Sequence, residues 1–301
     1  MTNQDEEFER RKLFENLTGP NPKTDLAHSP VLDHKLKSIG IRDNKLVSVL
    51  MRTFLVGFPD FPIRLPDGSE GVPSGTAFAL DVQGRQYLIT ASHVIKFPAK
   101  SPGEKGIIHI WRNDKWNPFK VKVVGRGDDN NPEDDIAVLA ADVHLPIPLT
   151  LSEESFDPSV VNMFLGQRVY FCGFPHGQYI KKDIIEGHPL AMTKGAILSG
   201  IQTKSGTRPE REKGLFILDG HNNEGFSGGP AVFQLGENQN VDFQVFGVVS
   251  GYQTEKVNVL HNGKPTEFIG IGNTGLMACP SIMRAVDMIE KNSIGFEIPA
   301  L

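Results

Sequence analysis

Short apolar runs separated by turn residues cover most of the chain and predict a protein built mainly from β-strands. The first block of such runs comprises Leu50–Phe58, Gly75–Val82, Gln86–Thr90, Gly106–Trp111 and Phe119–Val124. Between the second and third runs, Gln83 and Gly84 are typical of a hairpin turn. Antiparallel strands joined by short turns are therefore expected in this block.

A second block of strand-length runs follows an interruption that is rich in proline and acidic residues, from Asp142 to about Ser159. Its runs are Gln167–Cys172, Leu190–Ile201, Leu215–Asp219, Ala231–Gln234, Phe243–Ser250 and Glu267–Cys279. Two blocks of short strands with an extended connector predict an all-β fold made of two antiparallel barrels or sandwiches.

Helical patterns are expected only near the two ends of the chain. Residues 3–17 have acidic residues in the first turn and end at Gly19-Pro20, and a second short helix is expected at about Leu32–Ser38. Near the other end, Pro280 to Lys291 places its apolar residues on one face. The predicted organisation is a helical extension or linker, a first barrel, and a second barrel with a C-terminal helix, over residues 1–44, 45–150 and 151–301.

Composition narrows the class of protein. The 301 residues are 39% hydrophobic and 22% charged with a formal net charge of −5, which gives no support for a nucleic-acid partner. The sequence has no apolar run of the roughly 18 residues that span a bilayer, and residues 1–17 lack a signal-peptide pattern. We therefore expect a cytoplasmic protein with no membrane partner, no cofactor and no metal.

The two cysteines, Cys172 and Cys279, are too few for a disulfide framework. Both lie in or at the end of apolar runs, so two buried free thiols are expected, with a single disulfide as the alternative.

The candidate chemistry centres on Gly225-Phe226-Ser227-Gly228-Gly229-Pro230. Glycines around a serine let the backbone turn sharply, and the N–H groups can then converge on the oxygen of an attacked carbonyl. A serine hydroxyl is a weak nucleophile and needs a base, usually a histidine held by a carboxylate. His93 follows an apolar strand and the small residues Thr90-Ala91-Ser92. Asp135 directly precedes the apolar run Ile136-Ala137-Val138-Leu139, although the adjacent Asp134 is an alternative.

The order His93, Asp135, Ser227 and the motifs around these residues resemble the trypsin-like, chymotrypsin-fold serine peptidases, and in particular their disulfide-poor bacterial members. The resemblance covers about residues 45–291 and implies two six-stranded barrels. It implies that Ser227 attacks the scissile carbonyl, His93 transfers the proton and Asp135 orients His93. It also implies an oxyanion hole formed by the backbone N–H groups of Gly225 and Ser227.

The resemblance says less about the substrate, which it implies is a protein or peptide. His221 stands six residues before the serine, where relatives place the base of the specificity pocket, but a surface loop is an equal alternative. Ser250, Gly251 and Tyr252 resemble the edge that pairs with substrate backbone.

Phe226 stands where secreted zymogens carry an aspartate that pairs with a new N-terminal amine. We therefore predict activity without an activating cut, and residues 1–44 are a candidate site for a regulator instead. Two other functions remain open at this point. One is a catalytically silent module that binds peptides or proteins, and the other is an esterase or acyltransferase.

Overall fold

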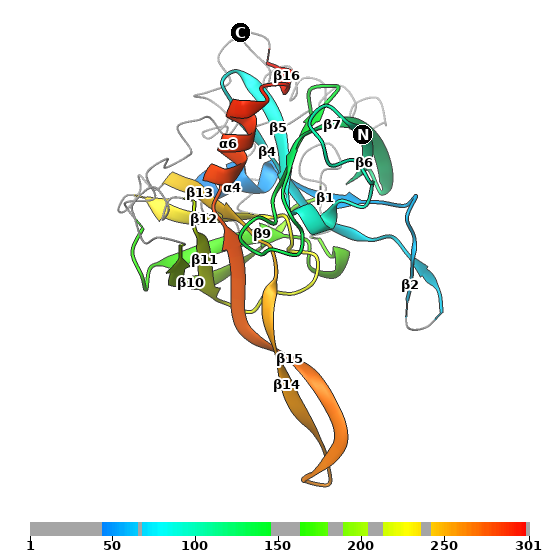
Figure 1. The fold of residues 1–301 in the computed structure, drawn as a ribbon, viewed down its shortest axis with the longest axis vertical. Coiled ribbons are helices and arrows are strands. Elements are labelled where there is room, and N and C mark those ends of the chain that lie inside the picture. The colour runs from blue at the N-terminus through cyan, green and yellow to red at the C-terminus, as the bar shows by residue number, and fades with distance from the viewer. Residues whose placement is uncertain are drawn as a thin grey trace, which may run out of the picture.

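The computed structural model of the protein describes residues 44–65, 68–145, 163–179, 189–203, 213–235 and 242–298. The fold is all-β, with strands making up most of the regular structure and only a few short helices (Figure 1). The helices expected at 3–17 and at Leu32–Ser38, and with them the predicted extension up to residue 43, lie outside the described residues.

The first sheet is a closed barrel of six antiparallel strands. Strand β5 pairs on one side with β4 and on the other with β8, with Leu88 opposite Leu139, and this second pairing closes the ring. The closed barrel confirms the first of the two predicted barrels. Its strands are β1 (Thr53–Gly57), β4 (Ser74–Val82), β5 (Arg85–Thr90), β6 (Lys105–Arg112), β7 (Lys115–Arg126) and β8 (Ala137–Ala141).

The run predicted as a strand over Leu50–Phe58 is divided between a helix and a strand. Helix α4 covers Asn44–Met51, and β1 begins only at Thr53. The prediction was therefore wrong at Leu50 and Met51. In the helix, Leu46, Val49 and Leu50 recur at the three-to-four spacing that places apolar residues on one helical face, toward the core.

The second sheet has seven strands in the order β13-β12-β9-β10-β11-β15-β14. Its ladder does not close as the first one does among the described residues, although one isolated bridge joins Gly247 of β13 to Ser281 just after β15. A second closed barrel therefore stays a prediction. The strands are β9 (Arg168–Gly173), β10 (Met192–Gln202), β11 (Leu215–Asp219), β12 (Pro230–Leu235), β13 (Asp242–Val248), β14 (Tyr252–His261) and β15 (Lys264–Pro280).

The hydrophobic pattern did not predict strand β14, which forms a long hairpin with β15 that projects from the body of the molecule (Figure 1). Asn262 and Gly263 connect the two strands and both have positive φ, 48° and 75°, as two-residue hairpin turns of the primed type require. A much smaller hairpin, β2 (Ile63–Arg64) with β3 (Glu70–Gly71), was not predicted either.

Among the described residues, the buried apolar side chains form three clusters. One fills the first barrel, another lies against the inner side of the second sheet, and the third joins the two halves. Strand β8 contributes to two of these clusters. Leu139 belongs to the cluster inside the first barrel, and its neighbour Val138 belongs to the cluster between the halves. The two halves therefore share a core, which fixes the position of the sites that each half carries.

The C-terminal segment packs on the first barrel although it follows the second sheet in sequence. Helix α6 (Met283–Lys291) lies on β7 and β8, and Asn292 Nδ2 donates a hydrogen bond to Val124 O at 3.1 Å. The short strand β16 (Phe296–Glu297) then adds to β5. The segment from α6 to β16 thus connects the second half to the first barrel.

Candidate active site

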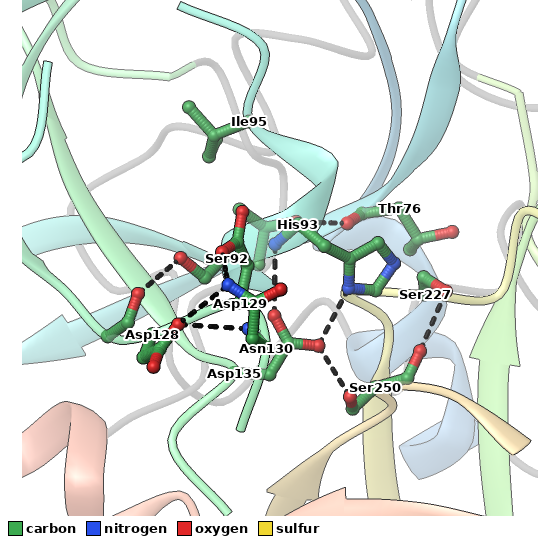
Figure 2. A network of polar contacts seen from close by, with 12 residues as sticks. Thr76, Ser92, His93, Ile95, Asp128, Asp129, Asn130, Asp135, Ser227 and Ser250 are labelled. Carbon is green, nitrogen blue, oxygen red and sulfur yellow. Dashed lines mark hydrogen bonds and ion pairs between the residues drawn. The ribbon is translucent and has the colours of Figure 1, made fainter. Parts of the chain in front are cut away.

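Barrel closure brings His93 and Asp135 together. His93 lies in a single helical turn, η1 (Ser92–Val94), just after β5, and Asp135 lies just before β8. Because β5 and β8 are paired neighbours, the two residues meet at one end of the barrel. The backbone N–H of His93 donates to Asp135 Oδ1 at 2.9 Å, and Nδ1 of the ring is 2.7 Å from Oδ2 (Figure 2).

The structure separates the two adjacent aspartates. The side chain of Asp135 is only 3% exposed and faces His93, whereas that of Asp134 is 38% exposed and lies 3.7 Å from Arg284. Burial alone raises the pKa of Asp135, but the hydrogen bonds and charge of His93 and the hydroxyl of Ser250 outweigh it, and the pKa lies below its usual value. Asp135 is therefore the carboxylate that stays ionised beside the imidazole.

Arg126, at the end of β7, braces the segment that carries His93. Its guanidinium donates to Ile95 O at 3.1 Å, to Phe97 O at 2.9 Å and to Ser92 Oγ at 3.2 Å. The Ser92 hydroxyl in turn donates to Gly127 O at 2.7 Å. Burial lowers the pKa of Arg126 from its ordinary value. This residue was not predicted, because carbonyl acceptors leave no residue pattern in a sequence.

The Ser227 loop requires its glycines for close backbone approach. Gly225 and Gly228 have φ of 98° and 85°, a region that L side chains rarely adopt. A Cβ at Gly228 would lie 2.0 Å from Thr76 O, and one at Gly225 would lie 2.2 Å from Phe174 O. The N–H of Thr76, in β4, donates to Ser227 O at 2.8 Å, so the loop docks directly on the first barrel.

The hydroxyl of Ser227 donates to Ser250 O at 2.8 Å. Within the described part of the chain it makes no hydrogen bond to His93, although the imidazole lies between Asp135 and Ser227 in the view of Figure 2. Ser250 also donates its own hydroxyl to Asp135 Oδ2. Ser250, predicted only as part of a substrate-binding edge, thus contacts both the carboxylate and the serine.

The backbone N–H groups of the two predicted oxyanion donors have no hydrogen-bond acceptor among the described residues. Among the described residues, the backbone N–H groups of Gly225 and Ser227 donate to no acceptor, while the intervening Phe226 N–H donates to Asn223 O at 3.3 Å. Unpaired backbone N–H groups at and near a serine can donate to an oxygen that develops negative charge.

Phe226 is fully buried and fixes the loop from beneath. Its ring packs edge-to-face on Phe171 with centroids 4.9 Å apart, and the glycine at position 173 leaves room for it. Lys194 Nζ lies 5.4 Å from the ring centroid and donates to His221 O at 3.0 Å. An apolar side chain, Phe226, therefore occupies the position where secreted zymogens carry an aspartate.

The residues predicted to contact substrate lie in different surroundings. His221 is exposed and contributes its carbonyl to Lys194, whereas the next residue, Asn222, is 1% exposed and its Oδ1 has no hydrogen-bond partner among the described residues. Ser250 is buried, and Gly251 and Tyr252 are half-buried beside it.

Two further features concern the cysteines and possible ligands. Cys172 and Cys279 are free and buried, as the first of the two alternatives predicted, and burial raises the pKa of both thiols, that of Cys172 to about 12. In the part of the chain that the structure describes, no cluster of histidine, cysteine or acidic residues could hold a metal, and none of the helices could cross a membrane.

Residues 75–238 match the model of the trypsin-like peptidase domain. No curated protein matches the sequence. The inactive form of the Rv3671c protease is 19% identical with a TM-score of 0.44, and the alignment covers 82% of this chain and 91% of that one. The HtrA-type protease AlgW with a decapeptide is 16% identical with a TM-score of 0.47, over 82% and 66%. The MamO protease domain of Magnetospirillum magneticum is 15% identical with a TM-score of 0.42, over 80% and 96%.

Proposed function

This chain belongs to the family of trypsin-like peptidase domains, and from that premise we propose that it is a serine endopeptidase. The proposed catalytic residues are Ser227, His93 and Asp135, and the proposed substrate is a protein or peptide.

In the proposed reaction, Ser227 Oγ bonds to the carbonyl carbon while its proton passes to Nε2 of His93. The negative oxygen of the tetrahedral intermediate accepts hydrogen bonds from the N–H groups of Gly225 and Ser227. The carbon–nitrogen bond then breaks, His93 returns the proton to the leaving amine, and an acyl-enzyme remains. Water, deprotonated by His93, repeats the sequence and releases the acid and the free serine.

The observation that carries the proposal is the hydrogen bonding between the Asp135 carboxylate and His93. The carboxylate faces Nδ1 of His93 at 2.7 Å and also accepts the His93 backbone N–H. A carboxylate acceptor requires the proton on Nδ1, so the lone pair of Nε2 is free to take a proton from a hydroxyl. Among the described residues Nε2 has no hydrogen-bond partner, which leaves it open to that role.

The hydrogen bond from Ser227 to Ser250 O favours the second candidate, a module that binds peptides without cleaving them. Under the peptidase hypothesis, a backbone N–H of the bound peptide donates to Ser250 O and replaces the hydrogen bond from the Ser227 hydroxyl. The Ser227 hydroxyl is then released and donates to His93. The two candidates therefore differ in whether the Ser227 hydroxyl ever becomes nucleophilic.

A fluorophosphonate probe distinguishes them, because it reacts only with an activated serine. We expect the full-length protein to be labelled, Ser227→Ala to lose labelling, and Ser199→Ala, an exposed serine on β10, to retain it. Cleavage of a peptide library would then establish the peptidase. Correctly folded wild-type protein that binds peptides but is never labelled would support the binding module.

The same probe tests activation. Because a buried phenylalanine anchors the loop where zymogens use an ion pair, we expect labelling of the uncut chain. Labelling that begins only after N-terminal trimming would contradict this expectation.

A further inference from the structure

The two proposed oxyanion donors belong to different peptide units of the Ser227 loop. The N–H groups of Gly225 and Ser227 are separated by the peptide that joins Gly225 to Phe226. Both can point at one oxygen only if this intervening peptide is held in one orientation. Glycine rotates more freely than any other residue, so Gly225 itself does not supply that restraint. The contacts of the peptide therefore decide whether the two donors converge.

A threonine of the first barrel holds this peptide at its oxygen. Thr76, in β4, is fully buried, and its Oγ1 donates to Gly225 O at 2.7 Å. At the other side of the same peptide, the N–H of Phe226 donates to Asn223 O at 3.3 Å. Because a peptide unit is planar, hydrogen bonds to its oxygen and from its nitrogen fix the orientation of the whole unit.

The backbone of Thr76 holds a second carbonyl of the loop. Thr76 lies next to Ser227, and its N–H donates to Ser227 O at 2.8 Å (Figure 2). Thr76 O in turn accepts the hydroxyl of Thr90, in β5, at 2.7 Å. One residue of the first barrel thus binds the carbonyls on both sides of Phe226, and it is itself bonded to the strand that precedes His93.

The Thr76 hydroxyl also joins the loop to the segment that follows β9. The N–H of Phe174 donates to Thr76 Oγ1 at 3.2 Å, and a Cβ at position 173 would lie 2.8 Å from that oxygen. An N–H group can only donate, so the hydroxyl accepts there and its single proton is directed to Gly225 O. A residue with a donor and an acceptor on one small group is therefore required at this junction.

We infer that Thr76 is a positioning residue for the proposed oxyanion hole, because its hydroxyl orients the Gly225–Phe226 peptide and with it the donors on either side. The inference rests on the proposed function. Thr76 acts through the loop backbone, and the two donors bind the oxygen that becomes negative in the transition state. Loss of the hydroxyl should therefore reduce turnover more than substrate binding.

The first test is Thr76→Val in the full-length protein. Valine keeps the shape of threonine but leaves Gly225 O without the hydroxyl donor and Phe174 N–H without the hydroxyl acceptor. We expect kcat for peptide cleavage to fall about 10- to 100-fold, somewhat less than the loss of a whole oxyanion donor, while KM changes less than about threefold. Thr76→Ser keeps the hydroxyl and should retain kcat within about threefold of the wild type.

Thr53→Val is the matched control. Thr53, in β1, is equally buried, and its hydroxyl donates to Val49 O at 2.7 Å. The same chemical change there should lower the thermal stability to a similar degree and leave kcat at the wild-type value. An equal fall of kcat in the two valine variants, or a wild-type kcat in Thr76→Val, would overturn the inference.

A pair of inhibitors separates the oxyanion hole from the rest of the substrate site. The Ser227 hydroxyl adds across the C=O bond of a peptide aldehyde, so that Oγ bonds to carbon and the former carbonyl oxygen occupies the proposed hole. The corresponding peptide alcohol forms no such adduct. In Thr76→Val the Ki of the aldehyde should rise by about the factor by which kcat falls, and that of the alcohol should change less than about threefold. Equal weakening of both inhibitors would contradict a positioning role.

Failure of the proposed function is distinguishable from failure of this inference. If the wild type neither cleaves peptides nor reacts with the fluorophosphonate probe, the peptidase proposal fails, and NMR relaxation of the backbone amides then tests Thr76 alone. The order parameters of the Gly225 and Ser227 amides should fall in Thr76→Val and not in Thr53→Val. Unchanged order parameters in Thr76→Val would overturn the inference.

A second substitution covers the case in which Thr76→Val does not fold. Thr76→Cys places a thiol, a weaker hydrogen-bond donor, at the same position. Its kcat, or the order parameters where there is no turnover, should lie clearly below those of Thr76→Ser. Values equal to those of Thr76→Ser would mean that the loop does not depend on the hydrogen bond to Gly225 O, contrary to the inference.

Discussion

In the first barrel, hydrogen bonds hold the proposed catalytic pair, whereas in the second sheet apolar packing and backbone contact hold the proposed nucleophile. His93 and Asp135 are joined by two hydrogen bonds, and Arg126 braces the segment around His93. Ser227 follows the fully buried Phe226 and lies between Gly225 and Gly228, where an added Cβ would clash with backbone atoms of Phe174 and Thr76.

The difference follows from what each part must do. A base and its carboxylate need an ionised, correctly oriented pair, which directional hydrogen bonds provide. Two N–H groups that point at one oxygen need a rigid backbone, which dense packing and positive-φ glycines provide. Damage to the first barrel site should therefore affect activity more than stability, and damage beneath the serine loop should affect both.

The largest effect is expected from Asp135→Asn. Without the carboxylate the ring of His93 loses its orientation and its stabilised imidazolium, and kcat should fall about 10⁴-fold, as in the Ser-His-Asp template. Steady-state cleavage rates measure this loss, and thermal unfolding measures the smaller loss of stability that accompanies it. Asp134→Asn is the matched control, and a comparable loss there instead would contradict the assignment.

Phe226→Ala should destabilise the fold more than any substitution among the hydrogen-bonded residues of the site. Removal of a fully buried ring from its contact with Phe171 should cost about 3–5 kcal/mol in the free energy of unfolding, measured by urea denaturation. The oxyanion donors should also be displaced, which slows probe labelling about 100-fold at temperatures where the variant is folded.

Phe216→Ala is the control for this change. Phe216 is equally buried in the same cluster, where it packs on Phe246 with centroids 5.2 Å apart. A similar loss of stability with normal labelling is expected. Equal slowing of labelling in both variants would mean that the loop has no special dependence on Phe226.

Acidification should reveal the hydrogen bonds of Asp135. Because its pKa is lower in the folded protein, its contribution to stability is present above the pKa of an unfolded aspartate and is lost as the pH falls through the lower, folded value. Ser250→Ala removes one hydrogen bond that lowers the pKa of Asp135, so the loss of stability on acidification should move to higher pH. In the same variant, kcat/KM should fall about tenfold. Urea unfolding and pH–rate profiles measure both. If the acid side of the stability and rate profiles is the same in Ser250→Ala as in the wild type, Ser250 does not lower the pKa of Asp135.

The smallest effect is expected at Lys194. Its Nζ lies over the Phe226 ring and donates hydrogen bonds to His221 O and Asn223 Oδ1. Lys194→Met should cost about 0.5–1 kcal/mol in the free energy of unfolding. Lys213→Met, which breaks an exposed pair with Asp287, should cost less. If Lys194→Met costs clearly more than this range, then a charge, and not only apolar packing, supports the serine loop.

The strand runs and the three motifs around His93, Asp135 and Ser227 could be found from the sequence because each is local. The six strands of the closed barrel were all marked by apolar runs, including the run that follows Asp135. Strand β14 was missed because Gln253, Glu255, Lys256 and Asn258 break the apolar pattern, and its only strand partner among the described residues is β15. The roles of Arg126 and Ser250 were missed because their partners are distant in sequence.

The sequence by itself determined an all-β chain with a serine loop, a histidine and a carboxylate in the trypsin-like order, since period and motif are properties of neighbouring residues. Only the tertiary structure decided that Asp135 rather than Asp134 faces His93, through the pairing of β5 with β8. It likewise decided that the Ser227 hydroxyl donates to Ser250 O and that the outer edge of β14 faces no other strand of the described residues. These outcomes depend on strand register and on which strands meet, and long-range packing sets both.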